Sequence, residues 1–281
     1  MPNALLASTR SATQRESYAF LAILALYLLG RVIEVLPFST PSTPYVALEI
    51  FCAFAFALIH GSLHYRLRGI LAFTAICLII GNTIENIGVA TGFPYGHYVF
   101  LSLMGPKLWH VPVLLGLAYI GMAYISWTLA RLILGATQMT LAGPRLLTVP
   151  LLASFIMTAW DFAQDPVWST LLHAWRWYDG GIWFGVPLTN YAGWLLTVFL
   201  IYTVFAFYLR RAAPLVAPSP HWRFAVLFYA LCAVGNVLQL LRPQPSRLIA
   251  DPSGEIWQAA AILRASALVS IFIMGLFALA A

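Results

Sequence analysis

The chain has 281 residues, of which 62% are hydrophobic and 9% are charged. A soluble domain carries about a quarter charged residues, so this composition excludes an ordinary soluble fold. The net charge is +6 and the pI is about 9.4. The basic residues are scattered along the chain instead of forming a stripe, which argues against nucleic acid as a partner.

Apolar stretches recur along the whole chain. A helix that crosses the hydrocarbon of a bilayer needs roughly 20 mostly apolar residues. Eight stretches approach or exceed this length, near residues 17–36, 45–64, 69–90, 111–134, 146–163, 191–210, 221–241 and 259–280. We therefore predict an all-α, polytopic membrane bundle of about eight transmembrane helices, forming a single domain over residues 1–281. The first stretch exceeds the roughly 7–15 apolar residues of a signal peptide, so we expect it to be retained.

The distribution of basic residues predicts the orientation of this bundle. The side that is richer in Lys and Arg normally faces the cytoplasm. With eight spans, nine of the fifteen basic residues fall on the side of the N-terminus and five on the other side. We expect the protein to lie in the inner membrane of a bacterium, with both termini in the cytoplasm.

Two long segments, residues 91–110 and 164–190, are rich in Gly, Pro and aromatic residues and fall on the non-cytoplasmic side. Loops of this length in a compact domain are usually functional. Enrichment of Trp and Tyr at a membrane interface explains the aromatics but not the acids that precede each loop. A weak internal repeat pairs the two regions, since Tyr119 and Trp194 each come eight residues after a Val-Pro pair.

Three acidic residues fall inside predicted spans, next to these loops: Glu85, Asp161 and Asp165. An ionised carboxylate at the bilayer centre costs about 2.5–3.5 kcal/mol, so such residues mark functional sites by default. Asp161 and Asp165 are spaced i, i+4 on one helix face, and Pro166 is expected to end their helix. The spans that carry the three acids run in the same direction, so we expect all three at one depth.

Asn82 and Asn86 share a helix face with Glu85, at i, i+3 and i+4. Like charges repel and low dielectric disfavours the charged form, so at least one of the three carboxyls is expected to be protonated. The structural alternative is that the acids pair with Lys107 or Arg176 or cap backbone amides. That alternative is favoured for the acids nearer the loop ends, which are Glu34, Glu49, Asp179, Asp251 and Glu255.

His60 and His64 are the one histidine pair at helical i, i+4 spacing. Imidazole is a common metal ligand, but membrane di-iron oxygenases need several such pairs. A structural role is therefore favoured, and no metal is expected. The sequence also lacks a Gly-rich nucleotide loop and a G-x-S-x-G elbow, so nicotinamide, ATP and acyl-enzyme chemistry are not supported.

Two blocks in the middle of the chain, about residues 80–200, carry a resemblance to a known family. They read ENIGVATGFPYGHYVF with MGPKLWHVP, and then WDFAQDP with WRWYDGGIWFGVPLTNYAGW. In this order they resemble the CruF-type carotenoid 1,2-hydratases of carotenoid biosynthesis. The resemblance implies addition of water across the terminal double bond of an acyclic end group, as in γ-carotene, lycopene or a bacterioruberin precursor.

Acid–base hydration suits the residues found above. Protonation at C2 leaves a tertiary cation at C1 and needs a neutral carboxylic acid, for which Glu85 and Asp161 are the candidates. Asp165 is expected to orient and deprotonate the attacking water, and no metal or redox cofactor is required. Aromatic faces would stabilise the cation, and Asn side chains would hold the water. The expected substrate-binding residues are Asn82, Asn86, Tyr95, Tyr98, Trp160, Trp175, Trp177, Asn190 and Trp194.

Two other functions remain open. Acids inside a membrane also build proton relays, so a proton-coupled transporter or an isoprenoid carrier is the first alternative. An isoprenoid cyclase is the second, because it shares the protonation step but shields the cation from water. The expected partners are a carotenoid in the bilayer and water, with other carotenoid enzymes as further partners.

Overall fold

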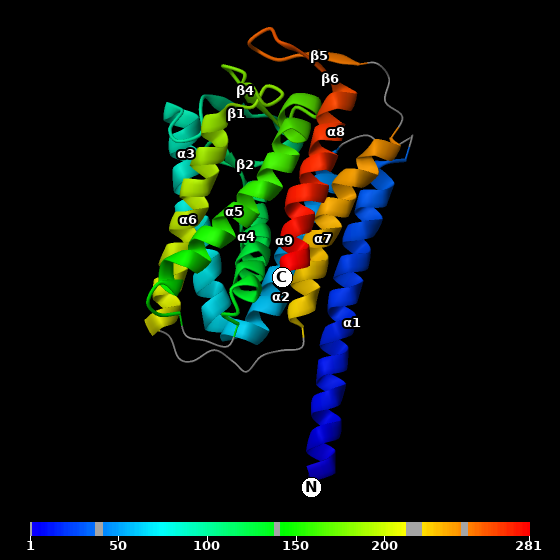
Figure 1. The fold of residues 1–281 in the computed structure, drawn as a ribbon, viewed down its shortest axis with the longest axis vertical. Helices are drawn as coiled ribbons and strands as arrows, with labels where there is room; N and C mark the ends of the chain where they lie inside the picture. The colour runs from blue at the N-terminus through cyan, green and yellow to red at the C-terminus, as the bar shows by residue number, and fades with distance from the viewer. Residues whose placement is uncertain (1, 37–41, 138–140, 212–220, 243–246) are drawn as a thin grey trace.

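Long apolar helices arranged side by side form the body of the protein (Figure 1). The computed structural model describes residues 2–36, 42–137, 141–211, 221–242 and 247–281. In that part of the chain, seven helices are long and apolar enough to cross a membrane. They are Gln14–Glu34, Thr43–Thr91, Val113–Ile133, Arg145–Leu171, Leu188–Arg211, Trp222–Leu241 and Ala259–Ala280. The chain is therefore an all-α, polytopic integral membrane protein, as predicted.

The predicted count of eight spans differs from these seven at one place. Both predicted spans 45–64 and 69–90 lie within Thr43–Thr91. The backbone of Arg66 leaves the helical region, with φ 57° and ψ 169°. Gly61 then lies against the side chain of Ile70, although nine residues of straight helix would separate them by about 13 Å. The chain thus turns back at Arg66, which makes two arms of one apolar stretch (Figure 1).

The spans are built from nine α-helices and three π-helical turns in the described part of the chain. The α-helices are α1 (Pro2–Glu34), α2 (Thr43–Ile76), α3 (Asn82–Thr91), α4 (Val113–Ile133), α5 (Arg145–Pro166), α6 (Leu188–Arg211), α7 (Trp222–Leu238), α8 (Ala259–Val269) and α9 (Gly275–Ala280). Three π-helical turns continue α2, α5 and α8, at Cys77–Gly81, Val167–Leu171 and Ser270–Met274. The α-helical pattern of the fifth helix ends at Pro166, as expected, but the chain runs on as a π-helical turn.

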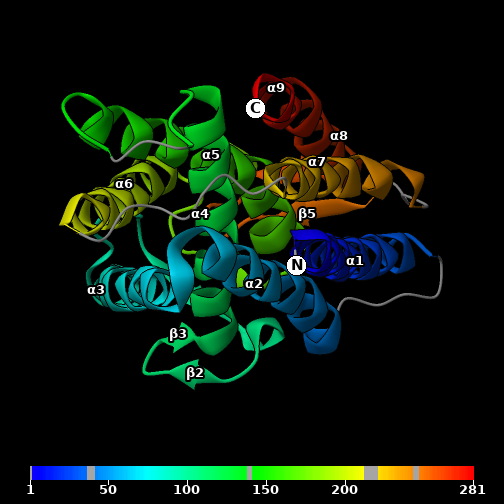
Figure 2. The same cartoon turned by 90° about the horizontal axis from the view of Figure 1, so that it is seen from below.

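Helix α4 forms the centre of the bundle. All of its residues from Ala118 to Arg131 are buried, as expected for a helix that is apolar on every side. It packs against α2, α5 and α7, and Figure 2 shows it between them. The outer helices instead expose large apolar side chains, which suits contact with lipid, among them Leu21, Leu29, Leu151, Phe155, Leu200, Phe207, Phe272 and Leu276.

The two long loops meet at one end of the bundle. Their short strands β1 (Tyr98–Phe100) and β4 (Trp175–Trp177) pair antiparallel, with Tyr98 opposite Trp177. Two other hairpins lie at the same end (Figure 1). They pair β2 (Lys107–Leu108) with β3 (Val111–Pro112) and β5 (Leu248–Ala250) with β6 (Ile256–Gln258). The loops therefore form a paired cap over the helix ends that carry the three acids.

Candidate functional site: a carboxyl pair at an aromatic cavity

Asp161 and Asp165 lie one turn apart on α5 and share one partner. Asn190, in the first turn of α6, donates from Nδ2 to Asp161 Oδ2 at 3.1 Å and to Asp165 Oδ2 at 2.6 Å. A side-chain amide carries two N–H groups, so one Asn can bind both carboxyls. All three residues are buried. The amide therefore fixes the distance between two acids that would otherwise repel.

Asp165 receives two further hydrogen bonds from the cap. Trp175 and Trp177 are two residues apart in β4, so their indoles lie on the same side of the strand. Their Nε1 atoms donate to Asp165 Oδ1 at 2.9 and 3.2 Å. With Asn190, three N–H groups point at this carboxyl, an arrangement that suits an ionised carboxylate. Among the described residues, Asn190 alone donates a hydrogen bond to the Asp161 carboxyl.

A cavity lies between the helices beside this pair. Its volume is about 710 Å³, part of it open to the surroundings. Asp161, Asp165 and Gln164 form its polar wall. Four indoles face the same space, together with apolar side chains of α2, α4 and the cap: Trp160, Trp168, Trp175 and Trp194, then Val46, Ile50, Ala53, Met104, Leu115, Ala118 and Met122. Mostly apolar pockets with a few converging polar groups are typical of small-molecule sites.

Glu85 lies in a separate cluster of tyrosines. Tyr119 donates to its Oε1 at 2.6 Å and Tyr98 to its Oε2 at 2.5 Å. Tyr95 contacts the Tyr119 hydroxyl at 3.3 Å and the Thr197 hydroxyl at 2.8 Å. Glu85 is 3% exposed and is not among the residues that line the described cavity.

The Glu85 cluster nevertheless touches the cavity wall. Tyr119 stacks on Trp194 with ring centroids 4.8 Å apart and an angle of 6°, and Trp194 lines the cavity. Tyr98 packs on Trp177, with ring centroids 4.9 Å apart, and Trp177 binds Asp165. Glu85 is thus linked to the cavity wall through Tyr119 and Trp194, and to Asp165 through Tyr98 and Trp177. The stacked Tyr119 and Trp194 are the two residues that the weak internal repeat paired.

The ion pairs that formed the structural alternative for the acids do not occur in the described part of the chain. Lys107 donates instead to the carbonyl of Phe100, and no salt bridge there joins Glu85, Asp161 or Asp165 to a basic side chain. Asn82 and Asn86 hydrogen-bond each other at 2.7 Å, and Asn86 also binds the backbone of His110. Neither residue lines the cavity or binds the carboxyl pair, whereas Asn190 binds both carboxyls.

Glu49 lines the cavity, although its position in the sequence favoured a structural role. It shares this cavity with the carboxyl pair and accepts from Arg31, Nη1 to Oε2, at 3.0 Å. Arg31 also contacts Glu34 at 3.1 Å and Asn236 at 3.1 Å.

Trp168 and Gln164 are two further cavity residues that were not predicted from the sequence. Gln164 comes three and Trp168 seven residues after Asp161, which indicates the same helix face and was the available signal.

His60 and His64 lie at the other end of α2 from the cap. His60 binds the hydroxyl of Tyr124 at 2.7 Å and the carbonyl of His221 at 3.2 Å, and the two His rings are 4.4 Å apart. No group of three or more His, Cys, Asp or Glu residues in the described segments is arranged to hold a metal ion. The surroundings of this pair suit packing within the bundle.

These features define a class: a helical integral membrane protein whose carboxyl-bearing aromatic cavity lies under a cap of paired loops. The model of one family, described as "Carotenoid biosynthesis protein", matches residues 43–246. This range includes both loops and every residue of the carboxyl pair. The chain therefore belongs to the carotenoid biosynthesis protein family.

One curated relative is the bisanhydrobacterioruberin hydratase of Haloarcula japonica. The two sequences are 34% identical over 132 residues, which cover 46% of this chain and 42% of the relative. The chain thus matches less than half of the relative's length. No solved structure matches this chain. The family and the relative together support a role in carotenoid biosynthesis.

Proposed function

We propose that this protein is a carotenoid hydratase, which adds water across the terminal C1=C2 double bond of an acyclic end group. The observation that carries the proposal is the carboxyl pair, Asp161 and Asp165, held by Asn190 at the wall of an aromatic cavity inside the bundle. The name of the relative, a hydratase, supports the same reaction. The apolar lining suits an isoprenoid end group, and in this proposal the rest of the molecule extends through the open part of the cavity.

In this mechanism Asp161 is the general acid. It receives fewer hydrogen bonds than Asp165, which suits a protonated carboxyl in an apolar site. Asp161 gives its proton to C2, and the electron pair of the double bond forms the new C–H bond. C1 becomes a tertiary cation. The indoles that line the cavity stabilise this cation, by about 0.5–2 kcal/mol each when water is excluded.

Asp165 is the general base. The three N–H groups around it favour its ionised form, and the water oxygen attacks C1 while a water proton passes to Asp165. That proton then returns to Asp161, so both residues recover their starting forms. Alkene and water give one tertiary alcohol, with no change of oxidation state and no redox cofactor in any step.

Glu85 has a positioning role in this proposal. It binds Tyr119, which stacks on Trp194, so it fixes the orientation of one indole at the cavity. Tyr95 supports the same cluster, because Gly88 and Gly193 both lie so close to its ring that a Cβ atom at either would approach it within 2.7 Å. Tyr95 thus acts through Tyr119, and Tyr98 acts through Glu85 and Trp177.

The test is expression in a bacterium that accumulates lycopene or γ-carotene, followed by mass and absorption analysis of the pigments. We expect each modified end to gain the mass of one water. The visible spectrum should stay unchanged, because the reacting double bond lies outside the conjugated system. A product of unchanged mass with a new ring would identify a cyclase, unchanged pigments would favour a carrier, and a gain of oxygen without hydrogen would identify an oxygenase.

A further inference from the structure

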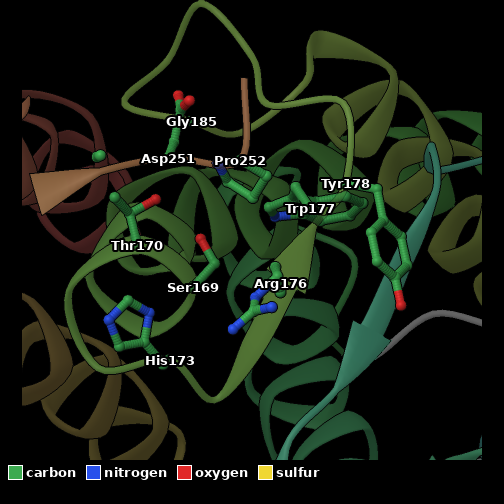
Figure 3. A pocket seen from close by; sticks show the side chains of 10 residues that line it. Ser169, Thr170, His173, Arg176, Trp177, Tyr178, Gly185, Asp251 and Pro252 are labelled. Carbon is green, nitrogen blue, oxygen red and sulfur yellow. The ribbon is translucent and has the colours of Figure 1, made fainter. Parts of the chain in front are cut away.

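A second pocket lies at the capped end of the bundle, where the span Arg145–Leu171 ends. Its volume is about 740 Å³ including its open side. The residues around it come from two regions that are far apart in the sequence, 169–185 and 250–252 (Figure 3): Ser169, Thr170, His173, Arg176, Trp177, Tyr178, Gly185, Ala250, Asp251 and Pro252. His173 and Arg176 are exposed. The pocket therefore combines charged and hydroxyl side chains with apolar ones, and part of it is open to the surroundings.

The turn between β5 and β6 forms one wall of this pocket and is held by Asp251. Its carboxyl accepts hydrogen bonds from the Ser253 hydroxyl at 2.6 Å and from Trp257 Nε1 at 2.8 Å. Burial acts to raise the pKa of Asp251, but these and backbone hydrogen bonds outweigh it and hold the pKa below its usual value. Asp251 thus stays ionised at neutral pH, and the wall keeps its shape.

Asp165 lies between this pocket and the aromatic cavity. Its Oδ1 accepts from Trp175, which lines the cavity, and from Trp177, which lines the pocket. Ser169 also lines the pocket and donates to the backbone carbonyl of Asp165 at 2.7 Å. The Trp177 indole and the helical turn from Asp165 to Ser169 therefore separate the two spaces at this point.

We propose that this pocket is the entrance through which water from the aqueous phase reaches Asp165. The inference rests on the proposed function, because hydration consumes one water in each turnover. The aromatic cavity is lined mainly by apolar groups, which hold water poorly. The pocket offers hydroxyl, carboxylate and guanidinium groups that bind water. Two of its lining residues, Trp177 and Ser169, hydrogen-bond to Asp165, the residue proposed to deprotonate the water.

Cysteine labelling tests this entrance, because the native Cys52, Cys77 and Cys232 are all buried. Ser169→Cys probes the floor of the pocket and Ala250→Cys probes its rim. The matched control is Ser102→Cys, which is exposed at the same end of the bundle but does not line the pocket. Each variant is placed in lipid nanodiscs and treated with sulfonatoethyl methanethiosulfonate, a charged reagent that does not cross membranes. Hydration is compared with that of the same sample before labelling.

We expect both pocket variants to react and to lose about tenfold or more of their hydration rate, since the base step that needs this water is worth about 10²–10⁴. Reduction with dithiothreitol should restore the rate, which a misfolded protein would not do. Labelled Ser102→Cys should keep its rate, and wild-type protein gives the background of the native cysteines.

Two results would overturn the entrance while leaving the proposed function intact. One is a pair of pocket cysteines that stay unlabelled while Ser102→Cys reacts. The other is full labelling of Ser169→Cys and Ala250→Cys without loss of hydration. Failure of the proposed function is seen separately, before any reagent is added, as wild-type protein that hydrates no carotenoid.

Discussion

Asp161→Asn is expected to lower the rate of hydration by about 10²–10⁴-fold, the range that general acid catalysis supplies. The amide has nearly the same shape and still accepts the hydrogen bond from Asn190, but it cannot give a proton of the required acidity. The variant should insert and accumulate normally. Product yield at matched protein level, from membranes supplied with an acyclic carotenoid, measures the effect.

Asp179→Asn is the matched control for this variant. Asp179 lies in the same cap and carries the same change, but it is exposed and contacts His97 at the surface, at 2.9 Å. Exposed ion pairs contribute about 0–1 kcal/mol, so this variant should hydrate normally. Near-normal yield from Asp161→Asn would remove Asp161 from the role of acid. A loss confined to Glu85→Gln would assign that role to Glu85.

Arg31→Met is expected to give the largest loss of stability, about 3–5 kcal/mol in the free energy of unfolding, which is typical when one partner of a buried ion pair is removed. Arg31 is 4% exposed and pairs with Glu49 and Glu34. Without the guanidinium, Glu49 stays at the cavity wall as an unpaired carboxyl that is only 11% exposed. The midpoint of thermal unfolding in detergent measures the loss.

The double variant Arg31→Met with Glu49→Met separates charge from packing. Replacing both partners of a buried pair by apolar residues of similar size is often neutral, so the double variant should recover much of the lost stability. A double variant that is less stable than Arg31→Met would show that packing around Arg31, not its charge, carries the effect. Gly235 lies against this side chain, with room for no Cβ atom beside Arg31 Nε.

Much of the helical bundle could be predicted from the sequence, because apolar length alone defines spans. The turn at Arg66 was treated as a loop between two spans, and its place was predicted within a few residues. The pairing of β1 with β4 was not predicted, since residues 98–100 and 175–177 show no alternation that distinguishes them from interfacial loops. The link between the two loops depends on tertiary packing.

The candidate site was predicted in part. The spacing of Asp161 and Asp165 fixed their common face, and helix geometry at i, i+4 is independent of the rest of the fold. Glu85 lies beside the cavity and not in its lining, and this depends on which helices surround it. The sequence alone could therefore not predict that Glu85 is absent from the cavity wall. Asn190 was one of three candidate asparagines, and only packing of α6 against α5 distinguishes it from Asn82 and Asn86.

The central claim is that water adds to the terminal double bond after protonation of C2. Its most direct test is turnover of lycopene or γ-carotene by the purified protein in water labelled with heavy oxygen, and separately in heavy water. The mechanism predicts one heavy oxygen per modified end, and one deuterium at C2 that does not exchange afterwards. A product whose new oxygen comes from dissolved oxygen gas, or whose C2 carries no deuterium from the solvent, would contradict it.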